Sequence, residues 1–129
     1  AAILRVKLPL LEGWNDSRRS IASRYNAAFT GLGFKALPSV DDSYAGHLYV
    51  ARIANRDALR EFLKAEGVTT DVHYPVPDHQ QAAYTDPRVA GSLAVTESSC
   101  KELVTLPCFP GMTDEQVATV IAAVEKYFA

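Results

Sequence analysis

The stretch from His73 to Tyr84, HYPVPDHQQAAY, most constrains how this chain can fold. It contains two histidines, two tyrosines and two prolines. Each proline fixes its backbone φ angle and removes a hydrogen-bond donor, so this stretch suits neither an ordinary helix nor a central strand. A stiff loop rich in polar and aromatic side chains commonly carries functional groups. We therefore expect a functional loop here, although the pattern does not define a reaction.

Length and composition indicate one globular domain over residues 1–129. Of these residues 48% are hydrophobic and 22% are charged, which is ordinary for a folded domain with a single core. No linker, repeat or low-complexity tract interrupts the chain. The net charge of −2 gives no electrostatic reason to expect nucleic acid or an anionic membrane as a partner. No apolar run approaches the roughly 20 residues that a membrane span needs.

The two cysteines, Cys100 and Cys108, indicate the compartment. A chain of this size needs no disulfide to be stable, so we expect two reduced thiols and a cytoplasmic protein. A disulfide or a reactive thiol remains the alternative.

The first 32 residues predict a long helix that is interrupted near Pro9, because proline removes a donor and crowds the preceding turn. Gly31 and Gly33 are expected to end it. The chain opens in mid-pattern, with apolar residues at helical spacing and no capping residue before them, as if it were cut inside a helix. The apolar positions beyond the proline recur mostly three or four apart: Leu11, Trp14, Ile21, Tyr25, Ala28 and Leu32.

Short strands and helices follow. The expected strands are residues 34–40, 47–53, 68–72 and 103–106. The expected helices are residues 56–66, capped by Asn55, then 92–102, and a last helix that begins at the capping box formed by Thr113 and Gln116. This order predicts an α+β fold, with a small, mainly antiparallel sheet covered by helices and a long N-terminal helix. A βαβ-like unit around residues 55–66 is possible, but no glycine-rich nucleotide-binding motif is present.

Candidate site residues concentrate in the 73–84 loop. His73, Tyr74 and His79 are the residues expected to contact a ligand, and the alternative is that the histidines only hold the turn. Tyr84 is expected to pack over the loop. His47, His73 and His79 lack the spacing of a metal site, so no metal is expected. Tyr49 is expected to cap the core, and Arg52 either binds an anion or is a solvated strand residue.

A complete catalytic apparatus is missing. No serine or cysteine lies in a nucleophile motif, and the aspartates suggest no acid–base pair. None of the five lysines has the apolar surroundings that would lower a lysine pKa and make it a Schiff-base nucleophile. These lysines are Lys7, Lys35, Lys64, Lys101 and Lys126. We therefore assign no catalytic residue to this chain.

Three segments, taken in order, resemble the C-terminal small domain of the DegT/StrS-type sugar aminotransferases, a pyridoxal-phosphate family. The resemblance covers essentially the whole chain, and the ordered set is more specific than any single motif. The segments are residues 1–8 with the WN, RR and A-x-x-Y patterns of residues 14–25, the loop of residues 73–84, and LPCFPGMTDE at residues 106–115 with the apolar helix that follows.

The resemblance implies a fold-type I enzyme that moves an amino group to a keto-sugar on a nucleotide carrier, in surface-polysaccharide, lipopolysaccharide or amino-sugar biosynthesis. It also implies a homodimer, and a large domain, absent here, that holds pyridoxal phosphate and its lysine. This chain would then bind no cofactor, and would close over the sugar pocket with His73, Tyr74 and His79 as lining. Two alternatives remain open: a free-standing α+β module that binds a small ligand or a protein, and a domain of a related sugar dehydratase or regulator.

Overall fold

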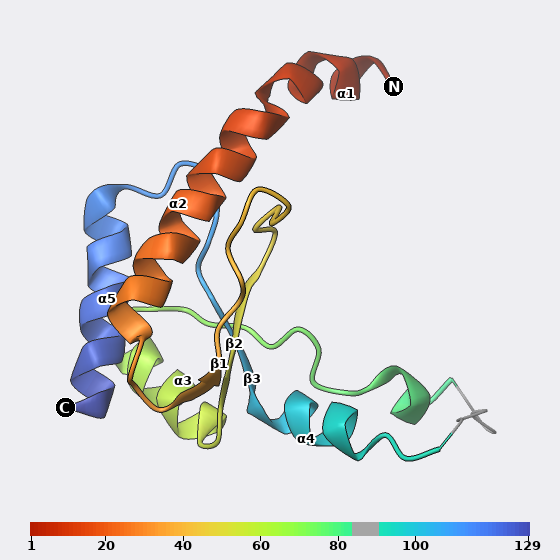
Figure 1. Ribbon diagram of the computed structural model, residues 1–129, viewed down its shortest axis with the longest axis vertical. Helices are drawn as coiled ribbons and strands as arrows, with labels where there is room; N and C mark the ends of the chain where they lie inside the picture. Colours follow the sequence, from red (N-terminus) through yellow and green to blue (C-terminus); the bar gives the residue numbers. More distant parts are fainter. Residues whose placement is uncertain (84–90) are drawn as a thin grey trace.

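A computed structural model describes residues 1–83 and 91–129 (Figure 1). The N-terminal helix is interrupted at the predicted place: α1 spans Ala2–Lys7, a 3-10 turn spans Leu8–Leu10, and α2 spans Leu11–Phe29. Gly31 has a φ of 88°, which confirms its role in ending α2. Gly33 serves packing instead, because a Cβ there would lie 2.6 Å from the Phe128 ring.

In the described part of the chain the sheet has three strands in the order β1-β2-β3, and both pairs are antiparallel. The strands are β1 (Phe34–Ala36), β2 (Tyr49–Ile53) and β3 (Leu103–Leu106). The bounds of β3 are those predicted, whereas β1 is shorter than the expected 34–40 and β2 begins two residues after position 47. The α+β class and the antiparallel sheet are confirmed.

The predicted strand at residues 68–72 is wrong. Only Asp71 pairs there, through an isolated antiparallel bridge to Thr105 on the outer side of β3. The backbone N–H of Val68 donates to the carbonyl of Leu63 at the end of a helix, and that of Val72 donates to the Asp71 carboxylate. Since these donors are used locally, they cannot form a ladder with β3.

Residues 1–83 and 91–129 contain three further α-helices. They are α3 (Arg56–Ala65), α4 (Ala94–Glu102) and α5 (Asp114–Phe128). The capping box of α5 is confirmed: the Gln116 amide donates to the Thr113 hydroxyl at 3.2 Å, and the Thr113 amide donates to the Gln116 side chain at 2.9 Å. Asn55 occupies the N-cap position of α3, but its side chain makes no capping hydrogen bond, so that part of the expectation is wrong.

The two faces of the sheet have different partners. Figure 1 shows α2 and α5 on one side of the strands, and α4 with the loop of residues 72–81 on the other. Paired residues share a face, so Tyr49 with Leu106 and Ala51 with Val104 point into the core. The main buried side chains around them are Tyr25, Phe29, Ile53, Leu59, Leu63, Val117, Val120 and Val124.

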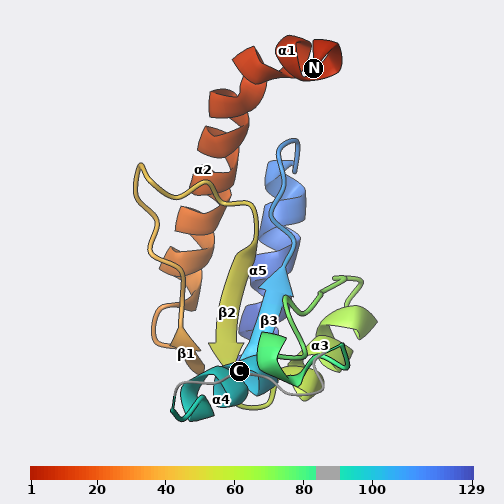
Figure 2. The same ribbon diagram turned by 90° about the vertical axis from the view of Figure 1, so that its right-hand side faces the viewer.

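The opposite face of the sheet carries Val50, Arg52 and Thr105. Figure 2 shows this face with the 72–81 loop beside β3 and α4 at the lower end of the strands. The predicted functional loop therefore rests on the side of the sheet that faces away from α2 and α5. In the described part of the chain, no helix has the length and apolar character to cross a lipid bilayer.

Candidate functional site: the 72–81 loop and its supports

The loop of residues 72–81 is irregular, as its prolines predict, apart from one 3-10 turn at Asp78–Gln80. Pro77 is buried, and its carbonyl accepts the backbone N–H of Gln80 at 3.0 Å to form that turn. The side chain of Gln81 donates to the Val76 carbonyl at 3.0 Å. These bonds give the loop a defined path along the sheet and α4.

His73 sits on β3. Its Nδ1 lies 3.0 Å from the Thr105 hydroxyl, and its Nε2 lies 3.7 Å from a carboxylate oxygen of Asp71. The imidazole also meets the Tyr74 ring edge to face, with 5.4 Å between the ring centroids. Three neighbours therefore surround a half-buried imidazole, and only the contact to Thr105 is a full hydrogen bond.

His79 contacts a different element. Its Nε2 lies 3.0 Å from a carboxylate oxygen of Glu97 on α4, and its side chain is only 16% exposed. This contact ties the loop to α4. It agrees with the alternative in which a loop histidine holds the turn.

Tyr74 is 68% exposed and lies at an open hollow of about 320 Å³. The other residues around the hollow are Val76, Pro77, Asp78, Gln81 and Cys100. Within the described residues no hydrogen bond, ion pair or ring contact joins His79 to His73 or Tyr74, whereas His73 and Tyr74 meet each other. Tyr84 lies outside the described residues.

A second open hollow, of about 390 Å³, borders the supports of His73. Asp71 and Thr105 line it, with His47, Leu48 and Phe109 among its other residues. Sequence reasoning missed Asp71, Thr105 and Glu97 as partners of the loop histidines. Asp71 is only two residues from His73, so its nearness could have been read from the sequence. Thr105 and Glu97 lie 32 and 18 residues from their histidines, and contacts over such separations leave no local signal.

Arg52 is neither a solvated strand residue nor free to bind an anion. Its guanidinium donates to the Glu102 carboxylate at 2.8 Å, and Lys35 donates to the other oxygen of the same carboxylate. Glu102 is almost fully buried, and its two cationic partners hold its pKa below the ordinary value. This cluster fastens the end of α4 to β1 and β2.

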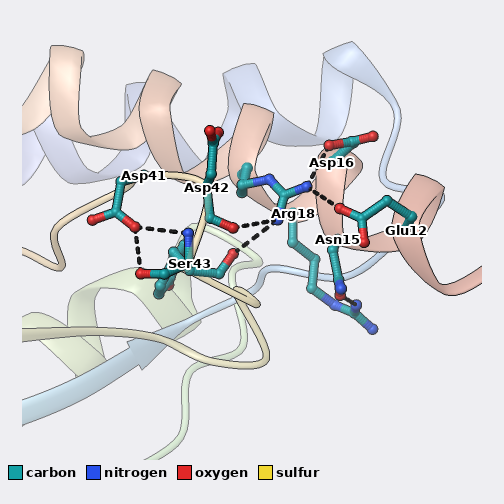
Figure 3. Close-up of polar contacts among 9 residues, drawn as sticks. Glu12, Asn15, Asp16, Arg18, Asp41, Asp42 and Ser43 are labelled. Carbon is teal, nitrogen blue, oxygen red and sulfur yellow. Dashed lines mark hydrogen bonds and ion pairs between the residues drawn. The ribbon is translucent and has the colours of Figure 1, made fainter.

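Arg19, the second residue of the arginine pair at residues 18 and 19, also has a structural role. It donates to the carboxylates of Glu12 and Asp16 and, at 3.4 Å each, to the carbonyls of Asp42 and Tyr44. It therefore fastens the loop before β2 to α2. Figure 3 shows Asp41 accepting hydrogen bonds from Ser43, which lower the pKa of Asp41.

The five lysines do not fit the role of a Schiff-base lysine. All five lysines are exposed, and two of them form ion pairs: Lys35 with Glu102 and Lys126 with Glu66. None has the dry, apolar pocket that a Schiff-base lysine needs. Nor do the described residues contain a group of three or more histidine, cysteine or acidic side chains able to hold a metal ion.

Both cysteines are free thiols. Cys108 is buried and approaches the carbonyl of Arg18 at 3.7 Å, and burial raises its pKa to about 11. The thiol therefore remains protonated near neutral pH, which is the behaviour expected of an unreactive structural cysteine.

Comparison with known proteins identifies relatives over almost the whole chain. A dTDP-3-amino-3,6-dideoxy-alpha-D-galactopyranose transaminase of Aneurinibacillus thermoaerophilus is 37% identical over 98% of this chain. A dTDP-3-amino-3,4,6-trideoxy-alpha-D-glucose transaminase of Streptomyces venezuelae is also 37% identical over 98% of it. The chain spans only 35% and 34% of the length of these two relatives, respectively.

Solved structures agree. The crystal structure of S. venezuelae DesV in complex with a ketimine intermediate matches with a TM-score of 0.89 and 36% identity, over 98% of this chain and 35% of DesV. The model of the DegT/DnrJ/EryC1/StrS aminotransferase family matches residues 1–125. The fold, the relatives and the family match all lead to one conclusion: this chain belongs to the DegT/DnrJ/EryC1/StrS aminotransferase family and corresponds to about a third of a family enzyme.

Proposed function

We propose that this chain is the C-terminal small domain of a pyridoxal-phosphate-dependent nucleotide-sugar aminotransferase, and that its 72–81 loop lines the sugar pocket. The observation that carries this proposal is the placement of His73 and Tyr74. Their side chains meet beside Thr105, on the sheet face opposite the core, and the ring of Tyr74 is exposed to a ligand. The relatives that act on dTDP-linked amino sugars support the substrate class, a nucleotide-linked keto-sugar.

The loop's contribution is binding and orientation. The exposed phenol of Tyr74 can donate to and accept from sugar hydroxyls or phosphate oxygens, and the imidazole of His73 can add a second hydrogen bond. A loop that closes over a substrate excludes water and holds the reacting group in position. We therefore assign the closing role to this domain, within surface-polysaccharide, lipopolysaccharide or amino-sugar biosynthesis.

The cofactor belongs, in this proposal, to the rest of the full-length enzyme. Pyridoxal phosphate supplies the electron-withdrawing ring on which amino groups are transferred, and it needs a lysine of the kind this chain lacks. The parent enzyme would be a cytoplasmic homodimer, as the family resemblance implies. This chain alone is then expected to bind the cofactor only weakly and to turn over no substrate.

The N-terminal segment offers a docking surface for the missing part of the enzyme. Neither α1 nor the 3-10 turn has a buried residue, and apolar side chains are exposed along both. Exposed apolar surface of this kind commonly marks an interface. The exposed residues are Ile3, Leu4, Val6, Leu8 and Leu10, followed by Leu11 at the start of α2.

The test uses the full-length enzyme that contains this sequence, assayed for amino transfer from glutamate or glutamine to a dTDP-linked keto-sugar. We expect H73N and Y74F each to raise KM for the sugar by about tenfold, the worth of one good hydrogen bond. Y127F, on the far helix α5, is the control and should leave KM unchanged. Normal KM values in both H73N and Y74F would show that the loop does not line the sugar pocket.

A second measurement separates the small-domain proposal from a free-standing module. The 129-residue chain is mixed with pyridoxal phosphate, reduced with borohydride and mapped by mass spectrometry. We expect only scattered, substoichiometric labelling of the exposed lysines. A stoichiometric adduct at one lysine would contradict the proposal, as would a start codon directly before Ala1 in the genomic sequence.

A further inference from the structure

We propose that Thr105 is a positioning residue that sets which nitrogen of His73 faces the substrate. The inference rests on the proposed function, since it takes His73 as part of the sugar pocket. It adds a residue that lies 32 positions further along the chain and does not itself need to touch the substrate.

The burial of Thr105 is the first argument. Its side chain is on the face of β3 opposite the core, yet the residue is only 6% exposed, and His73 of the 72–81 loop lies against it. A buried hydroxyl without a partner would destabilise the fold by about 1–3 kcal/mol. Its hydrogen-bond partner is the Nδ1 of His73, at 3.0 Å. The Thr105 hydroxyl therefore has its hydrogen-bond partner in the His73 imidazole, and the same bond restrains the imidazole.

The backbone supplies the second argument. Asp71 and Thr105 exchange both of their backbone hydrogen bonds, at 3.1 and 2.8 Å, so the chain is fixed to β3 just two residues before His73. The Val72 amide is held as well, at 2.7 Å from the Asp71 carboxylate. The bridge fixes the position of the backbone near His73. The hydrogen bond with the Thr105 hydroxyl then fixes the orientation of the imidazole ring.

One ring nitrogen remains available. Nε2 lies 3.7 Å from the nearest oxygen of Asp71, which is too far for a hydrogen bond, and that carboxylate is 73% exposed. A negative charge beside Nε2 favours a proton on that nitrogen, and the Thr105 hydroxyl can then donate to Nδ1. His73 therefore presents an Nε2–H donor, which suits an acceptor oxygen on the sugar nucleotide.

The experiment is a double-mutant cycle in the full-length enzyme. T105V keeps the shape of the side chain and removes the hydroxyl, whereas T105S keeps the hydroxyl. We expect T105V to raise KM for the sugar nucleotide by about tenfold, with kcat within about twofold, and T105S to restore KM to within about twofold. In an H73N background, T105V should change KM by less than about twofold.

Controls separate positioning from stability. T119V, on the outer surface of α5, is the matched threonine substitution and should leave KM unchanged. Thermal unfolding of every variant shows whether the enzyme is folded at the assay temperature. A T105V effect that is equally large with and without His73 would show a merely structural role and overturn the inference, as would a normal KM in a folded T105V enzyme.

The two proposals fail in different ways. If H73N leaves KM unchanged, the loop does not line the pocket and both proposals fall; if H73N raises KM but T105V does not, only the positioning role falls. A readout without substrate is the ¹⁵N spectrum of the full-length enzyme labelled at histidine. We expect the His73 signal to report an Nε2–H tautomer, and T105V to shift it towards a mixture of tautomers. An unchanged signal would contradict the inference.

Discussion

The Tyr49 hydroxyl donates a 2.8 Å hydrogen bond to the side-chain oxygen of Asn26, which joins the central strand to the longest helix. The amide nitrogen of Asn26 in turn donates to the Pro38 carbonyl at 2.8 Å. Tyr49 is fully buried, and its ring meets Tyr25 edge to face with 5.0 Å between centroids. Burial also raises the pKa of Tyr49, so the phenol stays a donor.

Replacing this phenol tests the connection between helix and strand. Y49F keeps the ring but leaves the oxygen of Asn26 without its donor in a part-buried site, so we expect a loss of about 1–2 kcal/mol in the free energy of unfolding. Urea unfolding measures it. Y127F is the matched control, since no hydrogen bond of the Tyr127 hydroxyl is found among the described residues, and it should change stability by less than about 0.5 kcal/mol. Equal losses in both variants would contradict the prediction.

The buried carboxylate of Glu102 predicts a sensitivity to acid. Lys35 and Arg52 lower its pKa, so its contribution to stability is present above the ordinary glutamate pKa and is lost as the pH falls through the lower, folded-state pKa. We expect E102Q to be less stable than the native chain at pH 7 and to lose less stability between pH 5 and about pH 3. Chemical unfolding at a series of pH values measures this. E61Q, an exposed glutamate without an ion pair in the described residues, should leave the pH profile unchanged.

The capping box at the start of α5 gives a third prediction. T113A removes the acceptor of the Gln116 amide and should cost about 1 kcal/mol in the free energy of unfolding, whereas T113S should cost much less. T119A, an exposed threonine inside the same helix, is the control and should be neutral or slightly stabilising, because alanine is the better helix former. Thermal unfolding distinguishes the three, and a T113A melting temperature equal to that of T119A would argue against the cap.

The exposed apolar surface of α1 predicts self-association of the isolated chain. We expect the 129-residue chain to form concentration-dependent oligomers in sedimentation velocity, and L4Q combined with L8Q to shift it towards monomer. V95Q is the control, because Val95 is 77% exposed but lies on α4. A native chain that stays monomeric at all concentrations would weaken the proposal that α1 docks on the rest of the enzyme.

Much of the fold could be predicted because its signals are local. Pro9 stops one helix, the Thr113 box starts another, and the alternation of residues 49–53 matches their burial in the structure. The wrong prediction at residues 68–72 concerns which acceptors the backbone N–H groups bind. Residues 68–72 have the composition of a strand, but the N–H of Val68 and that of Val72 are used by local acceptors.

The site was predictable only in part, for a related reason. The prolines and histidines identify the loop, but the partners of those histidines, Thr105 and Glu97, come from separate elements. Arg52 shows the same limit: alternation places it on the outer face, and only the fold brings it to Glu102. Patterns along the chain indicate which residues are exposed. Long-range contacts decide which of these side chains already have a hydrogen-bond or ion-pair partner within the protein.

The 3-10 turn at Leu8–Leu10 interrupts the N-terminal helix and separates α1 from α2. Pro9 lies in this turn and has no backbone N–H to donate, which accounts for the bend between α1 and α2 in Figure 1. An alanine at position 9 would supply the missing N–H and let α1 continue along the axis of α2. Under the proposal that α1 docks on the rest of the enzyme, Pro9 would therefore set the angle at which the two parts meet.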